Sequence, residues 1–343
     1  MINKNITHIN FAKGFRGGEK QTYNLILEFS KNDYIQELIV RKNSALSKQC
    51  KDIKNLKIIE LAKPYFFFVS SIKTSSLIYA HEAKAYQFSY IANLIYKIPY
   101  IIIRRVDISI KSNFLNKNIY QKSSKVVVLS TAIKNRVLNL SSKLNCTIIP
   151  DSISSFAVDK SNVHTLKEQY KGKFIIGNIA ALEKQKGQQY IIEVARKIQN
   201  KYPDIHFMLL GKGKDEELFQ DLSSDLENIT FTGFVSNVGD YLSIFDMFVF
   251  PTLSEGFGSS ILDAMQFDIP VVASKVGGIS DIINDNNGIL INLEKEDSLY
   301  NAIVELYNNR NLQISLSTRA KETLGNYKID NIFKQYELLL EKE

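Results

Sequence analysis

The sequence lacks the features that would point to a secreted, membrane-spanning or cluster-binding protein. Its 343 residues hold two cysteines, Cys50 and Cys146, too few for a disulfide framework or a metal cluster, which fits a reducing compartment. The most notable apolar run near the N-terminus, residues 65–69, is far too short to span a bilayer. The first five residues show no charged segment followed by an apolar one. We therefore expect a cytoplasmic protein without a bound metal.

Acidic residues are scarce in the first part of the chain. Residues 1–150 carry 24 Lys+Arg against 8 Asp+Glu, whereas residues 151–343 carry 19 against 28. The basic first part predicts either an anionic partner or simply a solvated basic surface. Anionic lipid and a phosphorylated acceptor are candidate partners. Nucleic acid is disfavoured, because no recognised nucleic-acid module is present.

The composition, 45% hydrophobic and 23% charged, predicts a globular chain large enough for two domains. Short apolar runs alternate with helical patterns and glycine turns, which is typical of an α/β protein with parallel sheets. The polar segment 159–169 is expected to be a linker, and residues 314–343 are expected to be helical. The predicted strands are 6–10, 35–41, 56–60, 77–80, 100–103, 125–129, 174–177, 206–210, 247–250, 269–274 and 290–292, with a further strand and turn at 229–235.

The most specific pattern lies between residues 247 and 281. A predicted strand leads into the turn Glu255-Gly256-Phe257-Gly258-Ser259, where a helix begins. Unpaired N–H groups at a helix start attract anions, and glycines let a ligand approach the backbone. Glu255 follows a strand, where open α/β sheets bind ligands, and Asp263 lies about one turn into the helix. Two carboxylates beside an anion site suit a ligand with phosphates and vicinal hydroxyls, such as a nucleotide sugar.

These residues resemble the family-4 retaining glycosyltransferases, which have the two-domain B-type (GT-B) fold. The family's signature of a Glu, seven residues and a second Glu stands here as Glu255-GFGSSIL-Asp263, with Asp in place of the second Glu. The match continues through Ala264-Met265, Pro270-Val271-Val272-Ala273 and Val276-Gly277-Gly278. The resemblance implies two Rossmann-like domains with parallel sheets facing a central cleft. Residues 1–158 would bind the acceptor, residues 159–315 would bind the nucleotide sugar, and a helix over 316–343 would cross back to the first domain.

The resemblance also implies which other residues contact the donor. Gly17-Gly18 forms a loop between strand and helix that would face the phosphates, and Lys186 would act on the diphosphate as a point charge. In the family an Arg before that lysine also holds the diphosphate, but Ala181 stands at its position here. Binding of the diphosphate is therefore weaker, or the role of the Arg shifts to Lys184 or Arg16. Two further turns near the nucleotide contain Gly211 and Phe234. The donor-binding set is completed by Gly256, Phe257, Gly258, Ser259 and Asp263.

Acceptor-side candidates follow two strands of the first domain. His81 comes after the strand at 77–80, and the pair Arg104-Arg105 comes after the strand at 100–103. Arginines suit phosphate or carboxylate recognition, and a His after a strand either lines a site or serves as a structural hydrogen-bonding residue. Family members can show a similar His and Arg-Arg. Glu255 and His81 are therefore the expected catalytic residues, and Arg104 and Arg105 are expected on the acceptor side.

The implied reaction is the transfer of a sugar from a nucleotide diphosphate sugar to an acceptor hydroxyl with retention, without metal or cofactor. The acceptor would be a glycan or glycolipid, such as a lipid-linked saccharide or lipopolysaccharide. The basic first domain would then lie peripherally on an anionic membrane, at the inner face of the cell membrane. The three phenylalanines at 66–68 either touch that membrane or pack as a core helix. Alternatives are a nucleotide-sugar epimerase or hydrolase of the same fold, or a weakly active donor-binding subunit of another transferase.

Overall fold

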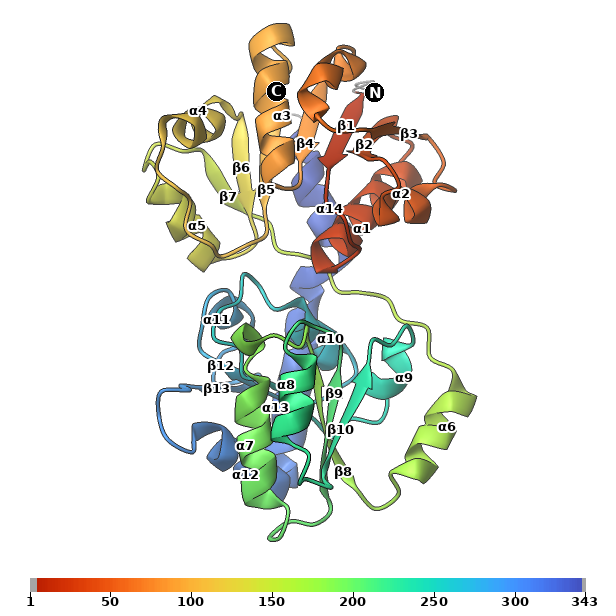
Figure 1. Ribbon diagram of the computed structural model, residues 1–343, viewed down its shortest axis with the longest axis vertical. Helices are drawn as coiled ribbons and strands as arrows, with labels where there is room; N and C mark the ends of the chain where they lie inside the picture. The colour runs from red at the N-terminus through yellow and green to blue at the C-terminus, as the bar shows by residue number, and fades with distance from the viewer. Residues whose placement is uncertain (1–4, 341–343) are drawn as a thin grey trace. The chain divides into compact units, whose positions relative to one another are not determined.

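The computed structural model describes residues 5–340, which form two compact units (Figure 1). One unit is built from the chain up to Ser152 together with the chain from Tyr327 onward, and the other is built from Ile153–Asn326. Each contains a sheet in which every strand pair is parallel, with helices on both faces. The predicted α/β fold of two Rossmann-like halves is therefore confirmed.

The sheet of the first unit has seven strands in the order β3-β2-β1-β4-β5-β6-β7 among the described residues. Its chain order reverses between β1 and β4, which lie side by side at the centre. The elements of this unit are β1 (Ile6–Asn10), α1 (Gly17–Lys31), β2 (Gln36–Arg41), α2 (Ala45–Cys50), β3 (Leu56–Leu61), the 3-10 helix η1 (Tyr65–Ile72), β4 (Leu77–Ala80), α3 (Ala83–Tyr96), β5 (Tyr100–Arg104), α4 (Phe114–Lys122), β6 (Lys125–Val128), α5 (Thr131–Leu138), β7 (Cys146–Ile148) and α14 (Ile329–Glu337).

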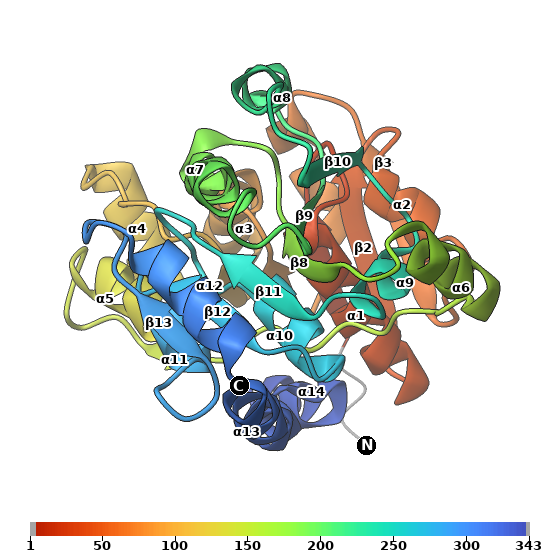
Figure 2. The ribbon, with the colours of Figure 1, turned by 90° about the horizontal axis from the view of Figure 1, so that it is seen from below.

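The second unit repeats this plan with a six-stranded sheet in the order β10-β9-β8-β11-β12-β13. In Figure 2, α7 lies on one face of this sheet and α10 lies on the other. The elements are α6 (Lys160–Gln169), β8 (Phe174–Ile179), the 3-10 helix η2 (Lys184–Lys186), α7 (Gln188–Ile198), β9 (Ile205–Leu210), α8 (Glu216–Leu222), β10 (Ile229–Gly233), α9 (Val238–Leu242), β11 (Met247–Phe250), α10 (Ser259–Gln266), β12 (Val271–Ser274), α11 (Ile279–Ile282), β13 (Ile289–Ile291), α12 (Ser298–Asn308), α13 (Arg310–Thr323) and the 3-10 helix η3 (Leu324–Tyr327).

Burial on both faces of each sheet explains why central strands such as β4 and β11 are continuous apolar runs rather than alternating ones. In β4, Leu77 and Tyr79 face a core that also contains Leu25 and Phe29 of α1 and Phe333 of α14. Burying each such side chain contributes roughly 1.5–3 kcal/mol. The last helix is thus held in the first unit by its apolar face, although it follows the second unit in sequence.

Two sequence expectations need correction. Residues 160–169 are not an irregular linker but the helix α6, which Asp159 caps by accepting the N–H of Ser161 at 2.8 Å. The helical C-terminal region is divided, because α13 belongs to the second unit and the chain enters the first unit at Tyr327. No helix between residues 5 and 340 has both the length and the apolar character needed to cross a bilayer.

Candidate functional site

In each sheet, several of the predicted site residues lie where the strand order reverses. In the second unit this point falls between β8 and β11, and Lys186 follows β8 while Glu255 follows β11. In the first unit it falls between β1 and β4, where Gly17-Gly18 and His81 follow these strands. Open α/β sheets bind their ligands at this crevice, beyond the carboxyl ends of the strands.

The second unit brings Lys186 and Glu255 into direct contact. The Lys186 ammonium (Nζ) lies 2.7 Å from Oε2 of Glu255, and the two side chains are 23% and 16% exposed. The other carboxylate oxygen, Oε1, accepts the backbone N–H of Gly256 at 3.0 Å. Both oxygens of Glu255 are therefore oriented by the protein itself, and a half-buried pair of opposite charges lies at the end of the sheet.

The loop that carries Lys186 is fastened to the loop that carries Glu255. The carbonyl of Gln185 accepts the N–H of Leu253 at 2.8 Å and the hydroxyl of Thr252 at 3.0 Å. The side-chain amide of Gln185 donates to the carbonyl of Ser254 at 3.2 Å. The two loops approach so closely that a Cβ on Gly187 would lie 1.8 Å from the Pro251 carbonyl oxygen. Only glycine fits there, so Gly187 fixes the position of Lys186.

The helix α10 begins beside Glu255, as the sequence predicts. Gly258 is its N-cap at φ +92°, and no side chain caps the helix start. The backbone N–H groups of Ser259 and Ser260 are thus available to an anion, whereas that of Ile261 donates to the Gly258 carbonyl at 2.9 Å. Asp263 is half-buried in the second turn of the same helix. Glu255, Gly256, Gly258, Ser259 and Asp263 are therefore all within one loop and helix start.

The remaining predicted donor residues divide into buried and exposed ones. Phe257 is buried, so its ring supports the turn from within. Gly211 has φ +140° and faces the Ala180 carbonyl, so it permits a close backbone approach. Phe234, by contrast, is 75% exposed and available to stack on a planar ligand.

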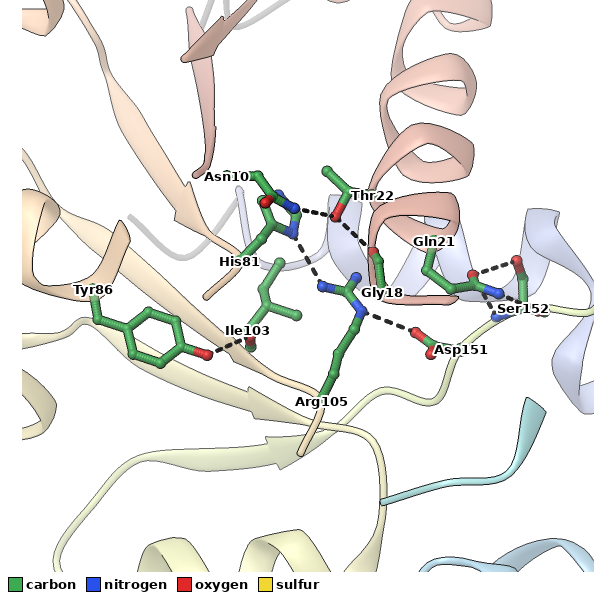
Figure 3. A network of polar contacts seen from close by, with 10 residues as sticks. All are labelled: Asn10, Gly18, Gln21, Thr22, His81, Tyr86, Ile103, Arg105, Asp151 and Ser152. Atoms are coloured by element: carbon green, nitrogen blue, oxygen red, sulfur yellow. Dashed lines mark hydrogen bonds and ion pairs between the residues drawn. The ribbon is translucent and has the colours of Figure 1, made fainter. Parts of the chain in front are cut away.

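In the first unit, His81 lies in a buried chain of hydrogen bonds (Figure 3). Its Nδ1 is 3.2 Å from Arg105 Nη1, and its Nε2 is 3.0 Å from His8 Nδ1. His8 Nε2 lies 3.2 Å from Oε1 of Gln36, whose amide N–H donates to the carbonyl of Ile26.

The chain of hydrogen bonds sets the tautomer of both histidines. Gln36 Oε1 can only accept, so His8 Nε2 carries its proton and His8 Nδ1 accepts from His81 Nε2–H. His81 Nδ1 then accepts from Arg105. Burial lowers the pKa of His8 to about 3, and burial together with the Arg105 charge lowers the pKa of His81 well below its usual value. His81 is thus neutral with both nitrogens engaged, and its catalytic role stays a prediction.

The two adjacent arginines have different surroundings. Figure 3 shows Arg105 between His81 and Asp151, with Arg105 Nε 3.2 Å from Asp151 Oδ1. Burial raises the pKa of Asp151, and the Arg105 charge offsets part of that rise. Arg105 also lies beneath Gly18 at the start of α1, since a Cβ on Gly18 would lie 3.6 Å from its Cδ. Arg104 instead donates from Nη1 to the Tyr120 hydroxyl at 3.1 Å.

Sequence reasoning did not find His8, Gln36 or Asp151. His8 and Gln36 lie within the predicted strands 6–10 and 35–41, where the sequence shows them only as strand residues. Asp151 was noted only as part of the segment leading out of the first domain. A polar side chain in the central strand of a sheet needs a hydrogen-bond partner, and that requirement is the signal that could have identified His8.

The family similarity of this chain is concentrated in the second unit. Residues 159–323 match the family model described as glycosyl transferases group 1. An uncharacterized glycosyltransferase of Methanocaldococcus jannaschii, MJ1178, is 29% identical over 219 residues, which cover 62% of this chain and 58% of that protein. The UDP-Gal:alpha-D-GlcNAc-diphosphoundecaprenol alpha-1,3-galactosyltransferase of Escherichia coli is 28% identical over 189 residues, covering 50% and 47%. The chain thus spans about half the length of these relatives.

Among solved structures, Anabaena Alr3699/HepE in complex with UDP-glucose is similar over 99% of this chain and 100% of that chain. The TM-score is 0.88 and the sequence identity is 17%, so this likeness concerns the fold alone. The family-model match covers all of the second unit from α6 to α13. Residues 159–323 are therefore a group 1 glycosyltransferase domain, and the GT-B resemblance expected from the sequence is confirmed.

Proposed function

We propose that this protein transfers a sugar from a nucleotide diphosphate sugar, best a UDP-sugar, to an acceptor hydroxyl. The observation that carries the proposal is the Lys186–Glu255 pair of 2.7 Å at the strand-order reversal of the second unit. It lies beside the uncapped start of α10, so one small region offers an ammonium, a carboxylate and free backbone N–H groups. The solved structure of similar fold was determined with UDP-glucose, which supports a UDP-sugar donor.

The chemistry assigned to these residues follows from their charges. The leaving diphosphate gains negative charge as the glycosidic bond breaks, and preorganised donors stabilise such charge best. Lys186 and the backbone N–H groups of Ser259 and Ser260 at the start of α10 supply these donors. Glu255 holds the sugar hydroxyls near an oxocarbenium-like centre, and Asp263 holds the ribose. The reaction is retaining and independent of metal.

The proposal is tested by thermal shift with UDP-glucose, UDP-galactose and UDP-N-acetylglucosamine. A ligand of the native state raises the melting temperature by mass action. The protein is then incubated with a labelled form of each stabilising donor and with acceptors from a lysate, and transfer of the labelled sugar is measured. Absence of stabilisation by every nucleotide sugar would contradict the proposal.

Two alternative functions are separated by the products. Incubation with the donor alone yields an epimeric nucleotide sugar from an epimerase, and free sugar plus nucleotide from a hydrolase. A transferase yields product in proportion to added acceptor. A donor-binding subunit without its own activity binds nucleotide but shows no turnover, an outcome that Ala181 and Asp263 keep open.

We further propose a lipid-linked saccharide or lipopolysaccharide-type acceptor, reached from the cytoplasmic face of an anionic membrane. Phe66, Phe67 and Phe68 are 53%, 70% and 40% exposed on η1, so they do not form the buried core helix that the sequence also allowed. The rings of Phe11 and Tyr65 stack with their centroids 3.9 Å apart, which holds the start of η1 against the first unit. Exposed aromatic rings in a basic domain suit a headgroup layer. The diphosphoundecaprenol acceptor named for the E. coli relative supports the same class.

A further inference from the structure

Arg104 is a buried cation that no carboxylate neutralises in the described part of the chain. Its side chain belongs to a residue that is 8% exposed, and none of the ion pairs formed within residues 5–340 includes it. Its Nη1 donates to the Tyr120 hydroxyl, its Nη2 donates to the Ile108 carbonyl, and its Nε has no partner. A guanidinium has five N–H donors, so these two bonds leave it incompletely satisfied.

A buried charge without a counter-charge is costly, and arginine does not escape the cost by losing its proton. Arg105 shows the usual solution, because Asp151 lies 3.2 Å from its Nε. The contrast between neighbouring residues of one strand end indicates that Arg104 is kept for a partner that the chain itself does not supply.

Arg104 lines a cavity of about 260 Å³ in the first unit, at the carboxyl end of β5. The cavity lies between the first turns of α3 and the segment from Val106 to Tyr120. The lining residues with polar side chains are Arg104, Lys111, Gln87, Ser109, Asn116, Tyr86 and Tyr120. The volume is somewhat below the range of roughly 300–1,000 Å³ for ligand sites, which suits one charged group and an attached ring.

The lining of this cavity contains two cationic residues and no Asp or Glu. The nearby acids in the sequence are committed elsewhere. Glu82 accepts the backbone N–H groups of Lys84, Ala85 and Phe11 as the cap of α3. Asp107 accepts from Arg136 at 3.0 Å. The cavity is therefore positively charged without local compensation.

Tyr120 adds a neutral donor to this site. Burial raises the pKa of its hydroxyl, so the hydroxyl remains protonated near neutral pH. Because its oxygen accepts from Arg104, its proton is left to donate. Arg104 and Tyr120 thus place a charged and a neutral donor next to each other in the cavity lining, which suits a phosphate or carboxylate group.

We propose that the Arg104 cavity binds an anionic group of the acceptor, a phosphate or a carboxylate carried on a sugar ring, and that Arg105 does not take part. That the ligand is the sugar acceptor rests on the proposed function, whereas the anion site itself rests on the geometry of the first unit. Val106, Ile108 and Ile110 line the same cavity and pack against the less polar part of the ligand.

The test compares a phosphorylated sugar with its neutral parent. Glucose 6-phosphate and glucose are titrated into the 343-residue protein saturated with UDP, so that phosphate sites for the donor are already filled. Wild type is expected to bind glucose 6-phosphate at least tenfold more tightly than glucose. Arg104→Gln is expected to reduce that preference to within about twofold, and Arg104→Lys to retain part of it.

Two further variants keep the test decisive if Arg104→Gln does not fold. Gln87→Glu places a carboxylate at the exposed rim of the cavity with almost no change of shape, and it is expected to abolish the preference for glucose 6-phosphate. Lys117→Gln removes an exposed charge from α4 that does not line the cavity, and it is expected to behave as wild type.

Three outcomes would overturn the anion site: no preference in wild type, an unchanged preference in Gln87→Glu, or an equal loss in Lys117→Gln. UDP affinity is measured for every variant in the same experiment. Unchanged UDP binding with no anion preference refutes the cavity proposal alone. Failure of wild type to bind UDP or any UDP-sugar refutes the proposed function instead.

Discussion

Glu255 is oriented before any donor arrives, because Lys186 and the N–H of Gly256 hold its two oxygens. Glu255→Gln keeps an oxygen for Gly256 and removes the charge. We expect the melting temperature to change little and transfer to fall by about 100-fold or more, the size of effect seen when one electrostatic contact to a transition state is removed. Sugar transfer at saturating donor, with a thermal melt of each protein, measures both quantities. Wild-type turnover by the variant would remove Glu255 from the catalytic role.

Asp263 tests a different kind of contact. If it holds the ribose, it binds ground state and transition state alike, so Asp263→Ala raises the donor KM more than it lowers kcat. Asp263→Glu restores the residue of the resembled family and is expected to keep or improve the donor KM. Steady-state kinetics with a varied donor concentration separates these effects. Normal nucleotide binding by Asp263→Ala would make the residue an ordinary acid on the side of α10.

At the scale of elements, the strands could be predicted almost completely from sequence. The structure has the predicted bounds for β1, β4 and β11. β4 and β11 are short, uninterrupted apolar runs, as is typical of parallel strands buried on both faces. The edge strand β7 (Cys146–Ile148) was missed because it is only half-buried and its residues do not form such a run. The polar helix α6 was mistaken for a linker because none of its residues is buried.

The candidate site could be predicted only in its positions along the chain. The sequence placed Glu255, Lys186, His81 and Arg105 after strands, and the structure agrees. Arg104, also expected after a strand, is the last residue of β5. Whether a side chain faces a partner depends on contacts between residues distant in sequence. Arg105 meets Asp151 and Arg104 meets Tyr120, and no local pattern distinguishes these two arginines.

The turn between η2 and α7 offers a prediction about stability. Gly187 has φ +77°, and a Cβ there would lie 1.8 Å from the Pro251 carbonyl oxygen. Gly172 has φ +76° and nothing within 4 Å of the same added atom, so it is a matched control. Gly172→Ala is expected to cost about 1–2 kcal/mol from the backbone alone, and Gly187→Ala to cost clearly more. Urea unfolding measures both, and equal costs would show that the loops separate without penalty.

The His8–His81 pair predicts a dependence of stability on pH. Both histidines are neutral in the native state, while in the unfolded chain they take up protons near pH 6.5. The unfolded state then binds more protons, so stability falls as the pH drops below about 6.5, by up to about 1.4 kcal/mol per pH unit for each histidine. Urea unfolding from pH 7 to pH 5 measures this loss.

Two variants distinguish the contribution of the buried histidines to this loss of stability from that of acids that titrate in the same pH range. His8→Gln removes one buried imidazole and is expected to reduce the slope of stability against pH. His164→Gln alters an exposed residue of α6 and is expected to leave the slope unchanged. The same slope in all three proteins would contradict neutral buried histidines.

At the scale of the whole molecule, the charges are distributed unequally along the chain. Residues 1–150 have 24 Lys+Arg and 8 Asp+Glu, and the rest of the chain is net acidic. General attraction to any polyanion therefore does not follow, since one unit attracts and the other repels. The exposed Phe66, Phe67 and Phe68 lie in the basic unit, between Lys63 and Lys73 in sequence. Aromatic and basic residues together suit an anionic membrane surface.

The purified protein is accordingly expected to co-sediment with phosphatidylglycerol vesicles but not with phosphatidylcholine vesicles. Each basic residue near such a surface contributes about 1 kcal/mol, so about 0.5 M salt should release the protein as the screening length shortens. Replacing Phe66, Phe67 and Phe68 with Ser should weaken binding at low salt. In the matched control, Leu218 and Leu222, which are exposed on α8 of the acidic unit, are replaced with Ser. This variant should bind the vesicles as the wild type does. Equal sedimentation with both vesicle types, or with neither, would leave a soluble glycan as the better acceptor, because no membrane surface would then bring the protein to a lipid-linked one.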